Sequence, residues 1–301
     1  MKTLSNSSAP RPLVDSSSRR PLPIHFTKMH VAGNDFIVVH DPDRTFPTAP
    51  AFVARLCAPH TGIACDGLIL VRPPTDPTAH FRMDFVNPDG SPAGMCGNGA
   101  RCAARFAHDN GIAPSSMRIE TAAGLHLADI LPDTQVRITF PATVNPVPQT
   151  LALPLPQALA PLVPLAHLEV HSLNTGVPHA VIPVPLSLLP TLDLPRLGSW
   201  VRHHPAFAPS GTNVDFIARP SDSTSPIPIR TYERGVEAET LACGTGITAS
   251  ALVAIHLGWT TSPATLVTPT GYRLQVTLSP LTLTGPAATL YTATLSPSLL
   301  P

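Results

Sequence analysis

The sequence is poor in charged and aromatic side chains. Of its 301 residues, 13% are charged and 5% are aromatic, and 19 basic residues balance 19 acidic ones, which gives a formal net charge of zero. A chain without excess positive charge lacks the field that attracts nucleic acid or an acidic membrane surface. We therefore expect neither as a partner.

Long apolar runs are also missing. No segment has the roughly 18 consecutive apolar residues that a membrane-spanning helix needs, and no hydrophobic signal core follows Met1. The sequence therefore predicts a cytoplasmic protein. The 5 cysteines agree, because an odd and small number does not suggest a secreted disulfide framework.

Sequence motifs for bound cofactors are absent as well. There is no CxxC pair, no His/Cys cluster with zinc spacing, no Walker sequence and no GxGxxG motif after a strand. We expect no cofactor and no metal.

Proline, by contrast, is abundant, with 38 residues that concentrate near the amino terminus and in the segment 141–195. Residues 1–23 are rich in Ser, Pro and Arg and show almost no apolar pattern. Such a composition predicts a disordered extension. An organelle transit peptide is the alternative, because Arg and Ser are frequent there and acids are few.

Two stretches of the chain resemble each other. Residues 95–107 read MCGNGARCAARFA and residues 242–254 read ACGTGITASALVA, so each has a cysteine, a Gly-x-Gly turn and a run of small helix-forming residues. The start of a helix has unpaired N–H groups and a partial positive charge. It can bind a carboxylate and lower the pKa of a thiol. Cys96 and Cys243 are therefore candidate catalytic residues.

The likeness continues beyond these turns. Thr121 and Gly124 follow Cys96 at the same distances at which Thr268 and Gly271 follow Cys243. A repeated order of turn, helix and strand predicts a duplicated domain, and the length suits two domains.

Hydrophobic periodicity predicts strands with one strong helix in each half. Expected helices lie at 51–59, 98–108 and 196–204, and expected strands lie in 24–40, 62–71, 81–86, 118–139, 167–184, 214–219, 228–232, 266–276 and 281–293.

Several residues have both a structural and a functional interpretation. Asn34 and Asn87 suit turns but could also face a ligand or the thiol. His179 is a loop histidine before an apolar strand and could lie beside a buried cleft. The remaining cysteines, Cys57, Cys65 and Cys102, are expected to pack in the core, and Arg101 and Arg105 are expected on a solvated helix face.

Together, the segments KMHVAGNDF, NPDG, MCGNGARC, GVPHAVI, GTNVDF and ERGVEAETLACGTG resemble the diaminopimelate epimerase family, from Phe26 to Tyr291. The resemblance implies an α/β (α+β) fold of two pseudo-symmetric domains. Each is a curved mixed β-sheet wrapped around a central helix, and the active site lies in the interdomain cleft. The implied domains are 24–140 with 285–301, and 141–284.

The resemblance also implies the activity. Members interconvert LL- and meso-2,6-diaminopimelate without a cofactor, in lysine and peptidoglycan-precursor biosynthesis. One thiolate removes the α-proton and a second thiol returns a proton to the opposite face. A homodimer is expected, with diaminopimelate as the small-molecule partner.

By the same resemblance, Cys96 and Cys243 are the catalytic pair, and His179 and Glu233 tune the proton affinity of the thiols. The implied substrate-binding residues are Asn34, Asn87, Gly97, Asn98, Asn213, Glu233, Arg234, Gly244 and Thr245.

Three positions depart from the family pattern. Gly67 stands where many members have a substrate-contacting Gln, and Val177 stands where many have Asn. The run between Glu233 and Cys243 is one residue longer than in members that read ERGxGET. These departures concern the distal end of the substrate and leave the thiols in place.

Three other functions remain open at this point. A proline racemase or hydroxyproline epimerase would use the same two-cysteine chemistry on another substrate. A redox protein would oxidise the paired thiols to a disulfide, and a binding protein of the same fold would have no catalysis.

Overall fold

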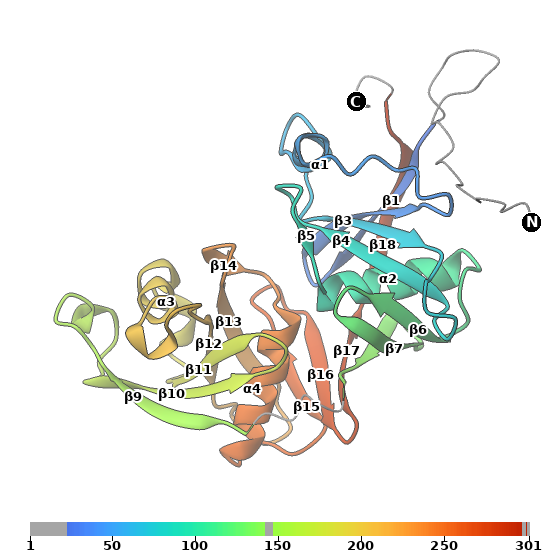
Figure 1. Ribbon diagram of the computed structural model, residues 1–301. Helices are drawn as coiled ribbons and strands as arrows, with labels where there is room; N and C mark the ends of the chain where they lie inside the picture. The colour runs from blue at the N-terminus through green and yellow to red at the C-terminus, as the bar shows by residue number, and fades with distance from the viewer. Residues whose placement is uncertain (1–22, 142–146, 297–298, 300–301) are drawn as a thin grey trace, which may run out of the picture. The chain divides into compact units, whose positions relative to one another are not determined.

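The computed structural model describes residues 23–141, 147–296 and 299 (Figure 1). The predicted disordered extension therefore lies almost entirely outside the described residues. The chain forms two compact units. Of the described residues, the first contains 23–30, Asp35–Leu125 and those from Ala288 to Ser296, and the second contains Val31–Asn34 and those between His126 and Ala287.

The expected domain boundaries at residues 140 and 285 stay a prediction. The compact grouping places residues 126–140 with the second unit.

The first unit is built on a mixed sheet with the strand order β18-β1-β2-β3-β4-β6, and β5 pairs with the end of β4. Its strands are β1 (His25–Val31), β2 (Asn34–His40), β3 (Leu68–Arg72), β4 (Phe81–Val86), β5 (Pro92–Ala93), β6 (Ser116–Thr121) and β18 (Ala288–Thr294), and β7 (Gly124–Ile130) starts at its border. The parallel pair β2 and β3 has almost continuously buried apolar sequences, FIVV and LILV, as expected for strands covered on both faces.

Helix α2 (Gly97–Asp109) packs against β3, β4 and β6. Its Ala-rich sequence permits a close approach to the sheet, and Ala100, Ala103, Ala104 and Ala107 are fully buried. The shorter helix α1 (Pro50–Cys57) buries Phe52, Val53 and Leu56 in a second apolar cluster of this unit.

The second unit has the strand order β9-β10-β11-β12-β13-β15-β16-β17-β8-β7, with β14 paired to β13. Its strands are β8 (Gln135–Thr139), β9 (Gln149–Pro154), β10 (His167–Asn174), β11 (Pro178–Val184), β12 (Asn213–Ala218), β13 (Ile227–Glu233), β14 (Ala238–Thr240), β15 (Ala264–Val267), β16 (Arg273–Leu278) and β17 (Leu281–Pro286). Three short 3-10 helices, Ala160–Leu162, Leu189–Thr191 and Pro205–Phe207, lie in its connections.

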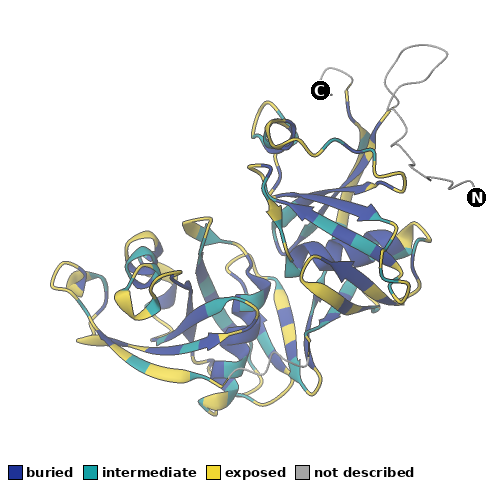
Figure 2. Cartoon of the chain, viewed as in Figure 1, coloured by how far each residue is buried: buried dark blue, intermediate teal, exposed yellow. Residues whose placement is uncertain are grey.

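Helix α4 (Gly244–His256) is the centre of this unit, because it packs against β10, β11, β12, β13, β15 and β16. Most of its residues are buried, as Figure 2 shows, whereas exposed residues concentrate in loops and outer strands. Helix α3 (Leu194–Arg202) covers β12, β13 and β14 from outside with its own apolar cluster.

The two units repeat one pattern. In the first, β2–β3 is parallel, β3–β4 antiparallel and β4–β6 parallel, with α2 inserted between β5 and β6. In the second, β11–β12, β12–β13 and β13–β15 repeat this series, with α4 between β14 and β15. Helices α2 and α4 both have 13 residues and both start directly after a cysteine. The predicted pseudo-symmetric α/β fold is confirmed.

The segment expected to form one last strand, 281–293, is wrong as a single element. It contains β17, which pairs with β8 in the second unit, and β18, which pairs with β1 in the first. Alternating threonines and apolar residues run through both strands, so the sequence pattern hides the break at Ala287.

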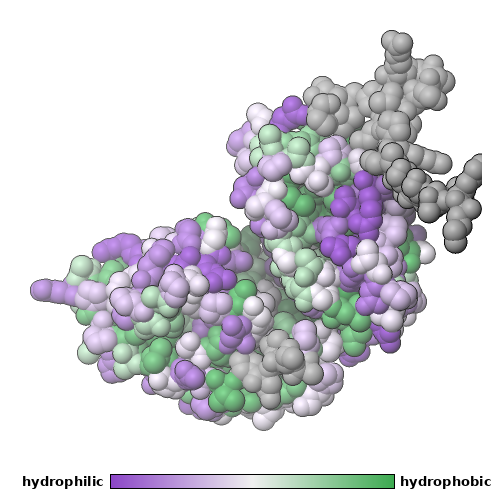
Figure 3. All heavy atoms as spheres, viewed as in Figure 1, coloured by the Kyte–Doolittle hydropathy of each residue, from purple (hydrophilic) through white to green (hydrophobic). Residues whose placement is uncertain are grey.

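Hydrophilic and hydrophobic residues are interspersed on the surface that Figure 3 shows. Within the described residues, no helix has the length and hydropathy that crossing a membrane would need.

Candidate active site

Cys96 starts the central helix of the first unit. Its extended backbone makes it the N-cap of α2, and its Sγ accepts a hydrogen bond from the backbone N–H of Gly99 at 3.3 Å. The residue is partly exposed, unlike Cys102 on the same helix, which is fully buried. A thiol that accepts a backbone N–H at a helix start is placed where negative charge on sulfur is stabilised.

Cys243 has the same position in the second unit. It is the N-cap of α4, and its Sγ lies 3.4 Å from Thr245 Oγ1. Its exposed fraction is only 7%. Burial and the nearby carboxylates of Glu233 and Asp215 raise its pKa well above the usual thiol value, while Thr245 and the Gly246 N–H act in the opposite direction.

For Cys243, the expectation that a helix start lowers the thiol pKa is therefore wrong. Desolvation disfavours the thiolate and outweighs the helix N–H groups.

His179 forms a fully buried pair with Asp215 and is connected to Cys243 through Thr245. The ring Nδ1 is 2.7 Å from Asp215 Oδ2, and both side chains have an exposed fraction of 0%. On its other side, Nε2 is 3.0 Å from Thr245 Oγ1. Strand β11 supplies His179, and β12, which pairs with it in parallel, supplies Asp215.

Asp215 was missed by the sequence analysis. The available signal was an aspartate between Val214 and Phe216 in an otherwise apolar strand, because a carboxylate at a buried position requires a partner.

Glu233 and Arg234 end β13 and enter the loop toward β14. The Glu233 carboxylate accepts a hydrogen bond from Thr240 Oγ1 at 2.8 Å. The half-buried Arg234 has no ion pair with any residue that the structure describes, so its guanidinium is available to an external carboxylate.

The candidate asparagines differ in the hydrogen bonds that their side-chain amides make within the protein. Asn213 Oδ1 accepts from the Arg234 N–H at 2.9 Å and its Nδ2 donates to the Pro178 carbonyl at 3.0 Å. Asn87 Nδ2 donates to Ser91 Oγ at 3.0 Å, inside its turn. The Asn98 carbonyl oxygen accepts from Arg101 at 2.5 Å.

Asn34 follows a tight turn whose Gly33 has a φ of 94°, a conformation that favours glycine. A Cβ on Gly33 would lie 2.7 Å from Leu241 Cδ1, so this turn approaches the loop that leads to Cys243. Asn34 therefore groups with the second unit, although its strand β2 belongs to the first.

The predicted site residues thus form one set in each unit. The first unit holds Asn87, Cys96, Gly97 and Asn98, and the second holds Asn34, His179, Asn213, Glu233, Arg234, Cys243, Gly244 and Thr245. Two of the three departures from the family pattern are single residues. Gly67 is buried against Phe85, where a Cβ would lie 2.5 Å from the ring, and Val177 is half-buried.

The solvated face expected for Arg101 is wrong. Arg101 has an exposed fraction of 0%, and its Nε and one terminal nitrogen have no hydrogen-bond partner among the described residues. Burial lowers its pKa to about 10. Arg105 agrees better with the expectation, because it is partly exposed and forms an ion pair with Asp109 at 2.9 Å.

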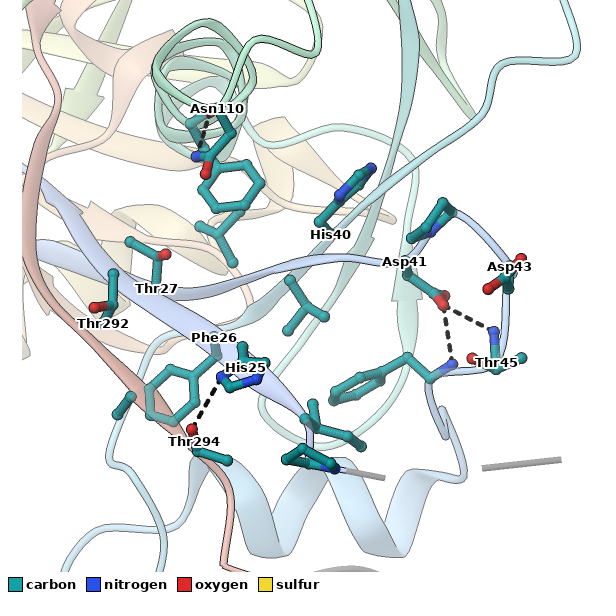
Figure 4. Close-up of a pocket in the computed structure, with 18 residues that line it drawn as sticks. His25, Phe26, Thr27, His40, Asp41, Asp43, Thr45, Asn110, Thr292 and Thr294 are labelled. Atoms are coloured by element: carbon teal, nitrogen blue, oxygen red, sulfur yellow. Dashed lines mark hydrogen bonds between the residues drawn. The ribbon is translucent and has the colours of Figure 1, made fainter. Parts of the chain in front are cut away.

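The first unit also has a cavity of about 640 Å³, which lies away from the candidate site residues (Figure 4). It is lined by residues of β1, β2 and β18 and by Phe106 and Asn110 at the carboxyl end of α2. Cys96 is at the opposite end of this helix, about 20 Å away at 1.5 Å per residue. None of the predicted site residues lines the cavity. No group of three or more His, Cys, Asp or Glu side chains in the described ranges is arranged to hold a metal.

Comparison with known proteins agrees with the motif pattern. A family model described as diaminopimelate epimerase matches residues 26–143 and 171–284. The chain is 38% identical over 263 residues to a diaminopimelate epimerase of Aquifex aeolicus (strain VF5), which covers 84% of this chain and 89% of the relative. It is 40% identical over 238 residues to one of Chlorobaculum tepidum, which covers 78% and 84%.

Solved structures share the fold at low identity. A phenazine biosynthesis protein of the PhzF family from Bacillus anthracis has a TM-score of 0.70 at 16% identity and covers 91% of this chain and 99% of its own. A probable proline racemase from Agrobacterium radiobacter K84 has a TM-score of 0.64 at 18% identity and covers 91% and 93%. The family model matches both units and the relatives align over most of their length, so the chain belongs to the diaminopimelate epimerase family.

Proposed function

We propose that this chain interconverts LL- and meso-2,6-diaminopimelate by inverting one α-carbon. Family membership supports the substrate. The observation that carries the mechanism is that Cys96 and Cys243 cap equivalent helices of the two repeated units.

The chemistry needs two groups on opposite faces of the α-carbon. In one direction, the thiolate of one cysteine takes the α-proton, and the electron pair stays on a planar carbanion. The thiol of the other cysteine then gives its proton to the opposite face. Each turnover leaves the first sulfur protonated and the second ionised.

The carbanion is stabilised without a cofactor in this proposal. Negative charge that develops on the substrate carboxylate faces the backbone N–H groups at the starts of α2 and α4, at Gly97-Asn98 and Gly244-Thr245. Arg234, which has no ion pair with the described residues, is the proposed partner of a second carboxylate. Asn34, Asn87, Asn213 and Glu233 complete the proposed substrate contacts, and His179 and Glu233 adjust the proton affinity of the thiols.

Location and assembly are proposed on the same basis. We place the enzyme in the cytoplasm, in lysine and peptidoglycan-precursor biosynthesis, as a homodimer. Strand β18 is paired on one side by β1 and exposes Leu290 and Tyr291, which supports an interface there.

The test is α-carbon exchange in D₂O, in metal-free buffer without pyridoxal phosphate. LL-diaminopimelate should take up deuterium at the α-carbon and yield the meso isomer, whereas proline should show neither exchange nor racemisation. Cys96→Ala and Cys243→Ala should each abolish epimerisation.

The matched control is Cys102→Ala, on the same helix as Cys96 but fully buried. It should retain turnover even if it costs about 1 kcal/mol of stability. Equal loss of activity in all three variants would contradict the assignment of the thiols.

A further inference from the structure

A continuous line of hydrogen-bonding groups leads from the Cys243 thiol into the core of the second unit. Cys243 Sγ is 3.4 Å from Thr245 Oγ1, which is 3.0 Å from His179 Nε2. The other ring nitrogen, Nδ1, is 2.7 Å from Asp215 Oδ2. Sulfur, hydroxyl, imidazole and carboxylate therefore follow one another within hydrogen-bonding distance.

We propose that Asp215 and Thr245 are positioning residues that couple the Cys243 thiol to His179 as a proton relay. This proposal rests on the proposed function, and it adds two residues to the machinery of the second thiol.

Both carboxylate oxygens of Asp215 have a hydrogen-bond partner, which fixes the orientation of the side chain toward His179. Its Oδ1 accepts a hydrogen bond from Thr231 Oγ1 at 2.7 Å, and its Oδ2 faces the imidazole. A carboxylate only accepts hydrogen bonds, so His179 must carry its proton on Nδ1. Nε2 is then left to accept a proton from the Thr245 side.

The first turn of α4 packs closely against the Asp215 carboxylate. A Cβ on Gly246 would lie 2.3 Å from Asp215 Oδ1, so only glycine leaves room for the carboxylate at the first turn of the helix. The N–H groups and the positive end of the helix stabilise a buried negative charge there. Thr175 Oγ1 fixes the same turn by donating to the Thr245 carbonyl at 3.0 Å.

The proton transfer balances in a simple way. Cys243 gives its S–H proton to the Thr245 oxygen, and the Thr245 hydroxyl gives its own proton to His179 Nε2. The result is a thiolate, an imidazolium and the unchanged Asp215 carboxylate. The buried sulfur can thus lose or regain a proton without contact with solvent, which resets it between turnovers.

The first unit lacks the equivalent relay. A Cβ on Gly246 would meet Asp215, and a Cβ on the equivalent Gly99 would meet Ile69, so the counterpart of Asp215 is Ile69. The matching registers are Val38–Ile69 and Val181–Asp215. The counterparts of His179 and Thr245 are then Phe36, a buried apolar residue, and Asn98. The relay is therefore particular to the buried thiol and is not a general feature of the repeated fold.

Charged groups on neighbouring strands decide the sign of the test. The carboxylates of Glu233 on β13 and Asp215 on β12 raise the pKa of Cys243, and His179 on β11 reaches the thiol only through Thr245. If Asp215 acts only as a nearby negative charge, its removal should make the thiolate easier to form. If Asp215 holds the relay together, its removal should make the thiolate harder to form.

The experiment measures alkylation of Cys243 by iodoacetamide against pH in the full-length protein, by mass spectrometry of the peptide. For Asp215→Asn and Thr245→Val, the midpoint of alkylation should move up by roughly one pH unit. With LL-diaminopimelate, kcat should fall by roughly 100-fold while KM changes by less than roughly 3-fold. Thr245→Ser keeps the hydroxyl and should restore both values.

Two controls match these changes. Asp222→Asn alters an exposed loop carboxylate that binds Thr224 and Ser225, and Thr248→Val removes a buried hydroxyl one turn further along α4. Neither should shift the midpoint.

A downward or unchanged midpoint in Asp215→Asn would overturn the relay. Should that variant fail to fold, Thr245→Val at a half-buried position decides alone, and an unchanged midpoint there has the same meaning. The alkylation result does not depend on diaminopimelate, so it stands even if the proposed substrate is not turned over.

Discussion

At the scale of single residues, the two candidate thiols share a helix position but differ in surroundings. The motif predicted both positions, because a cysteine before Gly-x-Gly and a helix is visible in the sequence. It could not predict the raised pKa of Cys243, which depends on burial and on carboxylates from β12 and β13. Arg101 shows the same limit, because helix periodicity does not reveal which face the sheet covers.

Arg234 is expected to affect substrate binding more than chemistry. A lysine there keeps the charge but loses the two parallel N–H bonds to a carboxylate, so Arg234→Lys should raise KM by roughly 10-fold or more, with a smaller change in kcat. Steady-state kinetics with LL-diaminopimelate measures this. The exposed Arg219→Lys is the control, and the same KM increase in both variants would remove Arg234 from the site.

Glu120 is expected to make the free energy of unfolding depend on pH in the acidic range. Hydrogen bonds from the Thr75 hydroxyl and from the backbone of Thr75 and Asp76, together with Arg82, lower its pKa to about 2. Its contribution is complete above the unfolded pKa of about 4.3 and is lost as the pH falls toward 2.

Urea unfolding at pH 7 and pH 3 should therefore show a larger loss of stability for the wild type than for Glu120→Gln, which has already lost this contribution. Parallel losses in the two proteins would show that Glu120 has no such role.

At the scale of elements, the repeat was predictable and the short strands were not. The matched spacings after Cys96 and Cys243 predicted the duplication, and the strand pairings confirm it. Strands β5 and β14 have only a few residues each, too few for a periodic pattern. Strand β9 lies in the proline-rich segment 141–195, where the sequence predicted no strand before residue 167.

The two central helices should tolerate the same substitution differently. Gly246→Ala places a Cβ 2.3 Å from Asp215 Oδ1, whereas a Cβ on the equivalent Gly99 would have its nearest contact, Ile69 Cδ1, at 3.3 Å. We expect Gly246→Ala to cost about 2–3 kcal/mol and Gly99→Ala less than half as much. Thermal or urea unfolding measures both, and a larger cost for Gly99→Ala would contradict this account of the packing.

At the scale of the whole molecule, the first unit depends on the last strand of the chain. β18 pairs with β1, and Tyr291 contacts Phe26 edge to face. The second unit is nearly continuous in sequence, from His126 to Ala287. The motif order predicted two domains. No local pattern shows that β18 belongs to the first, and only the family resemblance placed residues 285–301 there.

Deletion of residues 288–301 should therefore damage one unit only. We expect loss of amide protection in β1 and β2, because the β1–β18 ladder and the burial of Leu295 disappear, while α4 stays protected. Hydrogen exchange followed by mass spectrometry separates the two units. Uniform loss of protection would mean that the second unit does not fold independently.

The position of β18 also affects folding during synthesis. When β1 leaves the ribosome, the strand that completes its sheet has still to be translated, and at about 5–20 residues per second this takes on the order of tens of seconds. During that interval the edge of β1 that will pair with β18 is unpaired, although most residues of β1 are of a kind that the folded protein buries. The second unit does not precede β18 by much, because its strands continue to β17. The growing polypeptide thus has its greatest need of chaperone protection near its first-made end, and a slowed ribosome prolongs that exposure.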